Sequence, residues 1–594
     1  MSNSSTEYGL VSNEQFVGKL VQKYLFPSIC ALLGIQASGF VNSILIGRIL
    51  GGTGLGVVSL VAPVSLVYYS IGSLIGVGAS IVSSIALGKG DKEHCRQVYT
   101  QGFIIMLGVG IVLTAVGLVN LDRIVTLLGA EGDYYRHTYE YVRNYILGGM
   151  GMLLVYIPLN YLRITGKPRA AMVMLLFMSV AHIVGLGIFV ILLGQGVGGT
   201  ALASVVSGIL TFFLGMVLLQ DKNSILRFRR PRDPGKQFIM LVSAGSPSAL
   251  NNICQALQIF CINILFVRMG AGMFLPSYSL VFTISEVLLA VILGISQTAL
   301  PLVGISFGER DFRSIRIVMK KAMGIGNIIV GGCTLLLLVL HRQLGGLFGL
   351  QDPLILRQTG IGFIFLAGSL NLSFINNVIM NFFSATSRTA IANIIVVFRM
   401  VLFMVIPAYA LFPLANVYAV WISLVLTEFI TLSLVYLIMT IKHAKNPRLS
   451  RYLLLDDALM ENSKVIDFSV RNTSDDVASA SDKITGFCEE NDIPPQKTMR
   501  ISLAIEELII MINQYSLREG STEYTDVRIM ILGERIVMRI RNLGKYFNPV
   551  AYYYENKDTE EGREKTMGIG MILKMAQKAE YQETFGVNNL LITI

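Results

Sequence analysis

The sequence contains GVGASIVSSIALGKGDKEHCRQV (76–98) and, 220 residues later, SQTALPLVGISFGERDFRSIRIV (296–318). This register matches three pairs of glycine or charged residues: Gly88 with Gly308, Asp91 with Asp311, and Arg96 with Arg316. With one residue of slip, NYLRITGKPRAA (160–171) aligns with NFFSATSRTAIA (381–392). Apolar sequences share glycine and alanine by chance, but three matches in one register favour a duplication into two halves of the same orientation.

The composition is that of a membrane protein. Of 594 residues, 53% are hydrophobic and only 14% are charged, which excludes an ordinary soluble enzyme. Lys and Arg outnumber Asp and Glu, 48 to 38, but the charges are segregated: residues 1–445 hold 15 acids and 30 bases, and residues 446–594 hold 23 acids and 18 bases. We therefore predict a lipid-embedded region followed by a soluble one, with no nucleic-acid partner.

Twelve apolar stretches have the length of about 20 residues that a helix needs to cross the hydrocarbon. They lie at about 24–46, 54–78, 98–120, 138–160, 170–193, 199–219, 238–266, 275–302, 318–340, 358–382, 390–411 and 415–440. The predicted fold is an all-α membrane region in two parallel six-helix repeats, surrounded by lipid, with a soluble C-terminal domain. The predicted organisation is an N-terminal segment (1–23), a first bundle (24–220), a basic linker (221–237), a second bundle (238–445), a second linker (446–463) and a C-terminal domain (464–594).

Lys and Arg are unequally divided between the short loops on the two sides of these spans. One side carries 18 of them, including those of the linker LRFRRPRDPGK (226–236), and the other side carries 7. Cytoplasmic loops are enriched in Lys and Arg. We therefore expect a multi-pass protein of the cytoplasmic membrane with both termini in the cytoplasm.

Only two carboxylates lie well inside the predicted spans, Glu286 in span 8 and Glu428 in span 12. A charge in hydrocarbon costs a few kcal/mol, so such residues mark functional sites or ion pairs. Either acid could take up a proton, or lose it to a cation, as a cavity between the halves changes sides. Arg399 in span 11 could instead form a static ion pair with Glu428. His182 in span 5 is either a relay or a hydrogen-bonded core residue.

The six cysteines show no CxxC or Cys/His spacing, and several lie inside apolar runs. We expect them to be small core residues, with neither a disulfide framework nor a metal site.

Two stretches resemble the multidrug and toxic compound extrusion (MATE) family. FVNSILIGRILGGTGLGVVSLVAPV (40–64) is similar to its signature between spans 1 and 2, and GISQTALPLVGISFGERDFRSIR (294–316) to the counterpart between spans 8 and 9. The likeness covers about residues 15–440. It implies secondary antiport, in which an amphipathic and often cationic small molecule leaves the cell as H⁺ or Na⁺ enters, through alternating access of two six-helix bundles.

The chain departs from the family at positions implied for cation coupling. Many members have Asp at the position of Asn42, and Asn followed by Asp where this chain has His182 and Leu186. The first half therefore lacks the matching carboxylates, which leaves Glu286 or Glu428 as the implied coupling acid. Flippases of lipid-linked precursors share the architecture, so the cargo could also be of that class.

The C-terminal region reads as an α/β sandwich large enough to bury its own core. Periodicity predicts strands and helices in the order strand 464–470, helices 474–492 and 497–517, a hairpin of 526–532 and 535–541 around Gly533-Glu534, helix 568–580, and closing strands 581–585 and 588–594. The charged, tyrosine-rich segment 550–566 is predicted to be a lid over a nucleotide or a flexible docking loop for a cytosolic regulatory protein.

This order resembles the histidine-kinase-like ATPase fold, especially its anti-sigma-factor kinase branch. SLAIEELIIMINQY (502–515) is similar to its N-box helix, RNLGKYFNP (541–549) to its first glycine box, and GIGMILKMA (568–576) to its second. The resemblance implies a site for ATP with Mg²⁺. In it, Glu507 would activate the attacking water or hydroxyl, and Gly568 and Gly570 would present backbone N–H groups to the phosphates. Gly544 belongs to the first glycine box.

Two positions of this implied site are changed. Met511 stands where the family has the Mg²⁺-binding Asn, and a thioether is a poor ligand for that cation. Asn542 replaces the Asp that reads the adenine amino group. Asn513 lies about 200° around the helix from Met511 and cannot substitute for it. We therefore predict that ATPase activity is weak or absent.

Three readings follow for the whole chain. In the first it is a transporter with a regulatory tail, in the second a membrane-anchored serine kinase or receptor of the anti-sigma type, and in the third a scaffold without chemistry. We favour the first, because an anchor needs neither twelve spans nor a duplicated cavity, and because Met511 argues against a kinase.

Overall fold

A computed structural model describes residues 14–130, 133–220, 226–348, 352–456, 464–471, 474–517, 524–532, 535–558, 560–584 and 586–594. The chain forms two compact units. The first comprises Met1–Gln22, Asp311–Val318 and Met439–Ile594, and the second comprises Lys23–Arg310 and Met319–Ile438. Each is described separately below, and we call Met439–Ile594 the tail.

The membrane region is entirely helical. Its elements are α1 (Glu14–Gly88), α2 (Lys92–Val119), α3 (Leu121–Leu127), α4 (Asp133–Leu154), α5 (Tyr156–Ile164), α6 (Pro168–Leu186), η1 (Gly187–Leu192), α7 (Gly196–Leu219), α8 (Pro234–Arg268), η2 (Gly272–Phe274), α9 (Leu275–Gly308), α10 (Phe312–Leu340), α11 (Gln343–Leu347), α12 (Pro353–Ala385), α13 (Thr389–Val397), η3 (Phe398–Leu402), α14 (Phe403–Ala415) and α15 (Tyr418–Lys445). Twelve stretches in the described residues are long and apolar enough to span a membrane, which confirms the predicted number.

Helix α1 contains both of the first two spans, Glu14–Asn42 and Leu60–Gly88. The spacing of the predicted spans places a loop at 47–53. That prediction is wrong, because the backbone there is helical. The segment GRILGGTGLG (47–56) has glycines but no proline. No backbone donor is therefore lost, and the helical hydrogen bonds continue through it.

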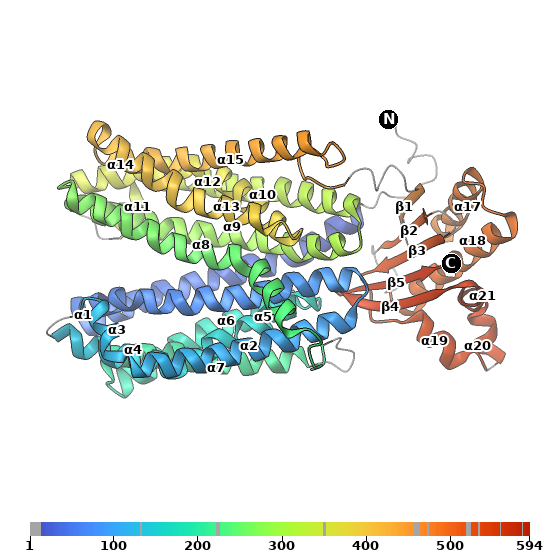
Figure 1. Cartoon of the computed structure of the whole chain (residues 1–594), viewed down its shortest axis with the longest axis horizontal. Helices are drawn as coiled ribbons and strands as arrows, with labels where there is room; N and C mark the ends of the chain where they lie inside the picture. Colours follow the sequence, from blue (N-terminus) through green and yellow to red (C-terminus); the bar gives the residue numbers. More distant parts are fainter. Residues whose placement is uncertain are drawn as a thin grey trace. The chain divides into compact units, whose positions relative to one another are not determined.

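The two halves are built alike, in agreement with the duplication. Helices α2, α4, α6 and α7 pack together in one half, and α8, α9, α12 and α13 in the other (Figure 1). The fifth span of each half contains a short π-helix, η1 after α6 and η3 after α13. A π-helix adds one residue to a turn and is frequent at functional sites.

The duplicated glycines meet where the second span of one half crosses the second span of the other. A Cβ atom added to Gly88 of α1 would lie 2.9 Å from Gly308 Cα of α9 and would collide with the Ile305 carbonyl oxygen. A Cβ atom added to Gly308 would likewise collide with the Ile85 carbonyl oxygen. At the aligned pair Ser84 and Gly304, a Cβ atom added to Gly304 would lie 3.1 Å from Ser84 Cβ. Two helix backbones therefore touch at this end of the bundles, which only glycine permits.

Gly88→Ala should destabilise the folded protein by about 1–3 kcal/mol, because the new methyl group meets backbone atoms that cannot rotate away. The measurement is the unfolding temperature in detergent. Gly108→Ala is the matched control, since a Cβ atom at that α2 position meets nothing within 4 Å and alanine favours the helix. Equal unfolding temperatures for the two variants would contradict the close crossing.

The tail contains a five-stranded antiparallel sheet covered on one face by helices. Its elements are β1 (Lys464–Arg471), α17 (Ser474–Glu490), α18 (Pro495–Tyr515), β2 (Tyr524–Leu532), β3 (Arg535–Asn542), α19 (Pro549–Asn556), α20 (Glu560–Lys565), α21 (Met567–Met575), β4 (Lys578–Thr584) and β5 (Val587–Thr593). The strand order is β1-β2-β3-β5-β4. The predicted α/β sandwich is confirmed.

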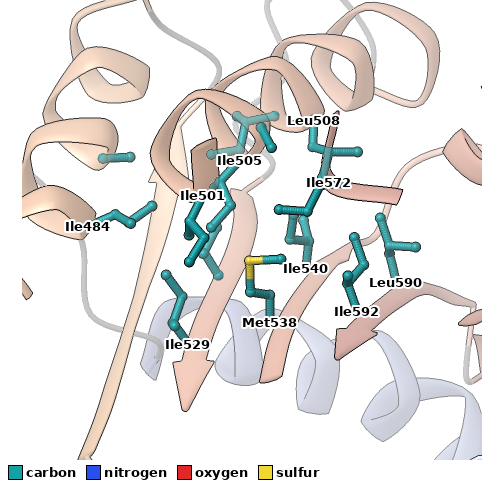
Figure 2. Packing of buried hydrophobic residues seen from close by; sticks show 14 of the residues in the cluster. Ile484, Ile501, Ile505, Leu508, Ile529, Met538, Ile540, Ile572, Leu590 and Ile592 are labelled. Carbon is teal, nitrogen blue, oxygen red and sulfur yellow. The ribbon is translucent and has the colours of Figure 1, made fainter. Parts of the chain in front are cut away.

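The core of the tail lies between the sheet and helices α17, α18 and α21 (Figure 2). It follows from alternation in the strands: Ile529 of β2 and Met538 and Ile540 of β3 point to the helices, where they meet Ile505 of α18 and Ile572 of α21. Residues between them along the strands, which carry charge, belong to the opposite face.

Two predictions for the tail are wrong. The helix that we predict over 568–580 ends at Met575, because Lys578–Thr584 pairs along its whole length with β5. The flexible docking loop that we predict as one alternative for 550–566 is also wrong, because the segment forms α19 and α20, and Asn548 begins α19 by accepting hydrogen bonds from the Val550 and Ala551 N–H groups. The other alternative, a lid over a nucleotide, stays a prediction. The β2–β3 pairing is confirmed, whereas its predicted turn, Gly533-Glu534, lies outside the described residues.

Candidate functional site

A cavity of about 120 Å³ brings the predicted acids together inside the second half. Its lining comes from α8, α9, α12, η3, α14 and α15, and it includes Glu286, Arg399 and Glu428. We expect cargo to bind between the halves, but this cavity lies within one of them. The reason is that the partners of both carboxylate groups, described next, come from second-half helices.

Arg399 and Glu428 form a buried ion pair, with 4% and 8% of their surfaces exposed. Arg399 Nε donates to Glu428 Oε2 at 2.9 Å and Nη2 donates to Oε1 at 2.6 Å. Ser373 Oγ accepts from the guanidinium at 2.7 Å, and Asn376 Nδ2 donates to Glu428 Oε2 at 2.8 Å. Arg399 lies in the π-helix η3, and its guanidinium contacts Glu428 of α15. Both charges are thus compensated, as a buried pair requires.

Glu286 has a different environment in the same cavity. Gln255 Nε2 of α8 donates to Glu286 Oε1 at 2.7 Å. Within the described residues, no ion pair involves Glu286. Gln36 of α1 donates to the Glu286 backbone carbonyl at 2.9 Å, which joins the first span to α9 at this level. A carboxylate with one neutral donor can gain or lose a proton without leaving a cation unpaired.

The sequence did not predict the partners Gln255, Ser373 and Asn376. The only signal was the number of amides and hydroxyls inside apolar spans, as in SLNLSFINN (369–377). Asn376 is fully buried, and its Oδ1 has no hydrogen-bond partner in the described part of the chain. An unpaired buried oxygen beside an ion pair is an acceptor available to a bound cation or hydroxyl group.

In the first half, His182 lies between two serines. Ser38 Oγ of α1 is 3.3 Å from His182 Nδ1, and Ser204 Oγ of α7 is 3.3 Å from Nε2. Ser204 Oγ donates to the Thr200 carbonyl, which leaves this hydroxyl to accept a hydrogen bond from His182 Nε2. Of the two interpretations of His182, this arrangement favours a hydrogen-bonded core residue over a proton relay. Asn42 is not in this network, and its buried Oδ1 has no partner among the residues described.

In the tail, Glu507 and Gly568 are brought together. Gly568, at the start of α21, donates its backbone N–H to the Glu507 carboxylate of α18. A Cβ atom on Gly568 would collide with that carboxylate, so the glycine permits the contact. The N–H group implied for a phosphate is therefore bonded to the protein's own acid. Gly570 N–H bonds within the helix to Thr566, and Gly570 packs against Tyr553.

The side chains at the two changed positions, Met511 and Asn542, are both buried inside the tail. Met511 is 4% exposed and belongs to the hydrophobic core of the tail. Asn542 is 2% exposed, and its Oδ1 accepts from Ser516 Oγ at 2.8 Å, Asn588 Nδ2 at 2.9 Å and Gly544 N at 3.0 Å. That oxygen has no capacity left for an adenine amino group.

These residues do not fit ATP with Mg²⁺ in the way that the resemblance implies. The metal-binding position is an apolar core side chain, the adenine-reading oxygen is saturated, and the phosphate-binding N–H group is occupied. Magnesium requires oxygen ligands in near-octahedral geometry. The arrangement supports a structural role for Glu507, Met511 and Asn542.

Comparison with known proteins agrees with this architecture. The MatE profile matches residues 27–188 and 247–410, and the histidine kinase-like ATPase domain matches 470–594. Multidrug export protein MepA of Staphylococcus aureus (strain MRSA252) is 23% identical over 366 residues, 59% of this chain and 80% of MepA. MepA of Staphylococcus haemolyticus is also 23% identical, over 369 residues covering 59% of this chain and 81% of that protein.

Solved structures show the same fold. A MATE crystal structure in complex with MaL6 superposes with a TM-score of 0.66 at 20% identity, covering 73% of this chain and 97% of that chain. A MOP superfamily transporter from Pyrococcus furiosus superposes with a TM-score of 0.67 at 21% identity, covering 75% of this chain and all of that chain. The chain therefore belongs to the MatE family of multi-pass membrane transporters and carries a C-terminal histidine kinase-like ATPase domain.

Proposed function

We propose that this protein is a secondary antiporter that exports amphipathic cationic small molecules in exchange for H⁺ or Na⁺, with both termini in the cytoplasm. The observation that carries the proposal is Glu286, a carboxylate in a membrane-embedded cavity with a neutral donor and, in the described part of the chain, no ion pair. Such a group can bind the coupling ion in one conformation and release it in another.

The cavity lining supports a cationic, partly apolar cargo. Tyr278, Phe282 and Trp421 contribute aromatic rings, and Met400 and Met404 contribute flexible thioethers. Aromatic faces attract cations, and methionine adapts to cargoes of different shape. Glu286 adds the only carboxylate of this lining that is not held by Arg399.

Within this proposal the two acids have separate roles. Glu286 exchanges the coupling ion, whereas the Glu428 carboxylate is held by hydrogen bonds from Arg399 and Asn376. His182 takes no coupling role, since its two ring nitrogens are satisfied by two serines.

The test is uptake into inverted vesicles under separately imposed H⁺ and Na⁺ gradients, with a fluorescent lipophilic cation such as ethidium as the probe. We expect one gradient, but not an equal osmotic gradient of a neutral solute, to drive accumulation. Accumulation that ignores both gradients, or that requires ATP, would rule out secondary antiport.

We further propose that the tail regulates transport without hydrolysing ATP. Purified full-length protein should show no Mg-ATP turnover above that of the Glu507→Gln variant, because the groups that would hold the nucleotide are bonded to one another. The measurement is phosphate release with the two proteins at equal concentration. Turnover that disappears in Glu507→Gln would instead support the membrane-anchored kinase.

A further inference from the structure

The tail presents a charged sheet face opposite its hydrophobic core. Arg528 of β2 pairs across the strands with Arg539 of β3, and Asp526 pairs with Arg541. We call these four residues the charged face. All are buried: Arg528, Arg539 and Arg541 are 8%, 5% and 7% exposed, and Asp526 is fully buried. Charged side chains on a strand normally face water, so the burial needs a covering partner of opposite charge.

That partner is Asp311, from the connection between α9 and α10. Its Oδ1 lies 2.5 Å from Arg528 Nη1, and its Oδ2 lies 2.7 Å from Arg539 Nη2 and 3.8 Å from Arg541 Nη2. Asp311 is fully buried. Asp311, the segment that follows it to Val318 and the tail all belong to the first compact unit.

The ionised state of Asp311 follows from these contacts. Burial by itself would raise the pKa of the carboxyl group, but the guanidinium groups of Arg539, Arg528 and Arg541 outweigh it and hold the pKa well below its usual range. The carboxylate is therefore charged, and it supplies the close anion for Arg528 and Arg539, while Arg541 Nη2 lies 2.8 Å from Asp526 Oδ2.

The duplication provides an internal comparison. Asp91 occupies the equivalent position in the first half. Both residues begin the following helix, since Asp91 accepts from His94 N at 2.8 Å and Asp311 accepts from Ser314 N at 3.0 Å. Asp91 is exposed, whereas Asp311 is fully buried against the arginines. The helix-capping role that both residues share therefore does not explain why Asp311 is buried.

A second set of contacts joins the same face of the tail to the start of α1. The Arg541 guanidinium lies over the Phe16 ring at 5.3 Å, and Lys19 Nζ lies over the Tyr524 ring at 4.7 Å. The segment Asp311–Val318, which we call the Asp311 segment, makes a further contact. In it, Arg313 Nη1 lies 2.6 Å from Asp467 Oδ1 of β1. The tail thus holds the beginning of the first half and the Asp311 segment of the second half at once.

We propose that the charged face is a clasp that binds the Asp311 segment and the start of α1 together, and so restrains the relative movement of the two halves during transport. Alternating access requires the halves to move against each other. The clasp joins the start of α1, which enters the first half, to the residues that begin α10 of the second half, so it must open for that movement. This inference rests on the proposed function of the tail as a regulator.

The experiment compares Asp311→Asn with Asp91→Asn in the full-length protein. Both variants keep an oxygen that can cap the helix, but only the first removes a charge from the clasp. We expect Asp311→Asn to increase hydrogen exchange of the 311–318 amides and to raise the ethidium export rate about fivefold or more, the scale of ordinary coupling between sites. Asp91→Asn should change neither.

Two further measurements keep the test decisive. The thiol of Cys488, fully buried in the tail core, should stay unreactive in Asp311→Asn if the tail remains folded. If it becomes reactive, Lys19→Gln replaces that variant, because it weakens the other arm of the clasp and leaves the charged face intact. It should raise the export rate in the same direction.

The outcomes separate the two proposals. If Asp311→Asn matches Asp91→Asn in both exchange and export, there is no clasp. Faster exchange with unchanged export would show that the contact exists but does not restrain transport, which overturns the proposal. If neither the wild type nor any variant exports ethidium under either gradient, the proposed function fails, while the exchange data still decide whether Asp311 holds the tail.

Discussion

We expect Glu286→Gln to reduce gradient-driven export to the level of empty vesicles. Glutamine keeps the size of the side chain and can still bond to Gln255, which holds Glu286 Oε1 at 2.7 Å. It cannot, however, release a proton or neutralise a cation. The cavity therefore can no longer bind the coupling ion on one side of the membrane and release it on the other. The measurement is ethidium accumulation in inverted vesicles under the gradient that drives the wild type.

The control for this prediction is Glu140→Gln, which changes an acid of an exposed pair on α4. It should leave export unchanged. A second check is ethidium binding without a gradient, since loss of coupling need not remove the aromatic lining of the cavity. If Glu286→Gln exports at the wild-type rate, Glu286 is not the coupling residue, and antiport would have to use another group.

We expect Arg399→Met to destabilise the folded protein by about 3–5 kcal/mol, the usual result of leaving a buried charge without its partner. Glu428 is 8% exposed and depends on Arg399 for its ion pair. The double variant Arg399→Met/Glu428→Gln should recover much of this loss, because a neutral amide can still bond to Asn376. The measurement is the unfolding temperature in detergent, read from exposure of buried cysteines.

The chain offers a matched pair for comparison. On α4, Arg136 Nε lies 3.2 Å from Glu140 Oε1, and the Arg136 side chain is 85% exposed. Arg136→Met should therefore cost at most about 1 kcal/mol, because solvent screens an exposed pair. If Arg399→Met costs no more than Arg136→Met, the ion pair does not stabilise the second half, and Glu428 would become a candidate for ion exchange.

The fold was largely predictable, and the failures have local causes. Hydropathy predicts twelve spans because hydrocarbon selects long apolar helices. The loop inside α1 was wrong because glycine permits a turn without requiring one. Lys578 was assigned to a helix because its strand character comes from pairing with Thr593 of β5, and β propensity depends strongly on such neighbours.

The candidate sites were predictable only in part. The sequence singles out Glu286 and Glu428 as rare intramembrane acids, but the partners Gln255 and Asn376 lie 31 and 52 residues away along the chain. Which helix faces which is set by packing, so no spacing in the sequence reports it. The same holds for Gly568, whose N–H group is taken by a side chain 61 residues earlier.

The number of spans and the α/β class of the tail follow from the order of residues alone, since they depend on hydropathy and local periodicity. The duplication follows from residues that match at one register of the sequence. The tertiary structure decided which polar groups are satisfied. Asp91 and Asp311 have equivalent places in the duplicated sequence, yet one is exposed and the other lies against three arginines. The physical reason is that a charge is paired by what surrounds it in space, and those neighbours come from distant parts of the chain.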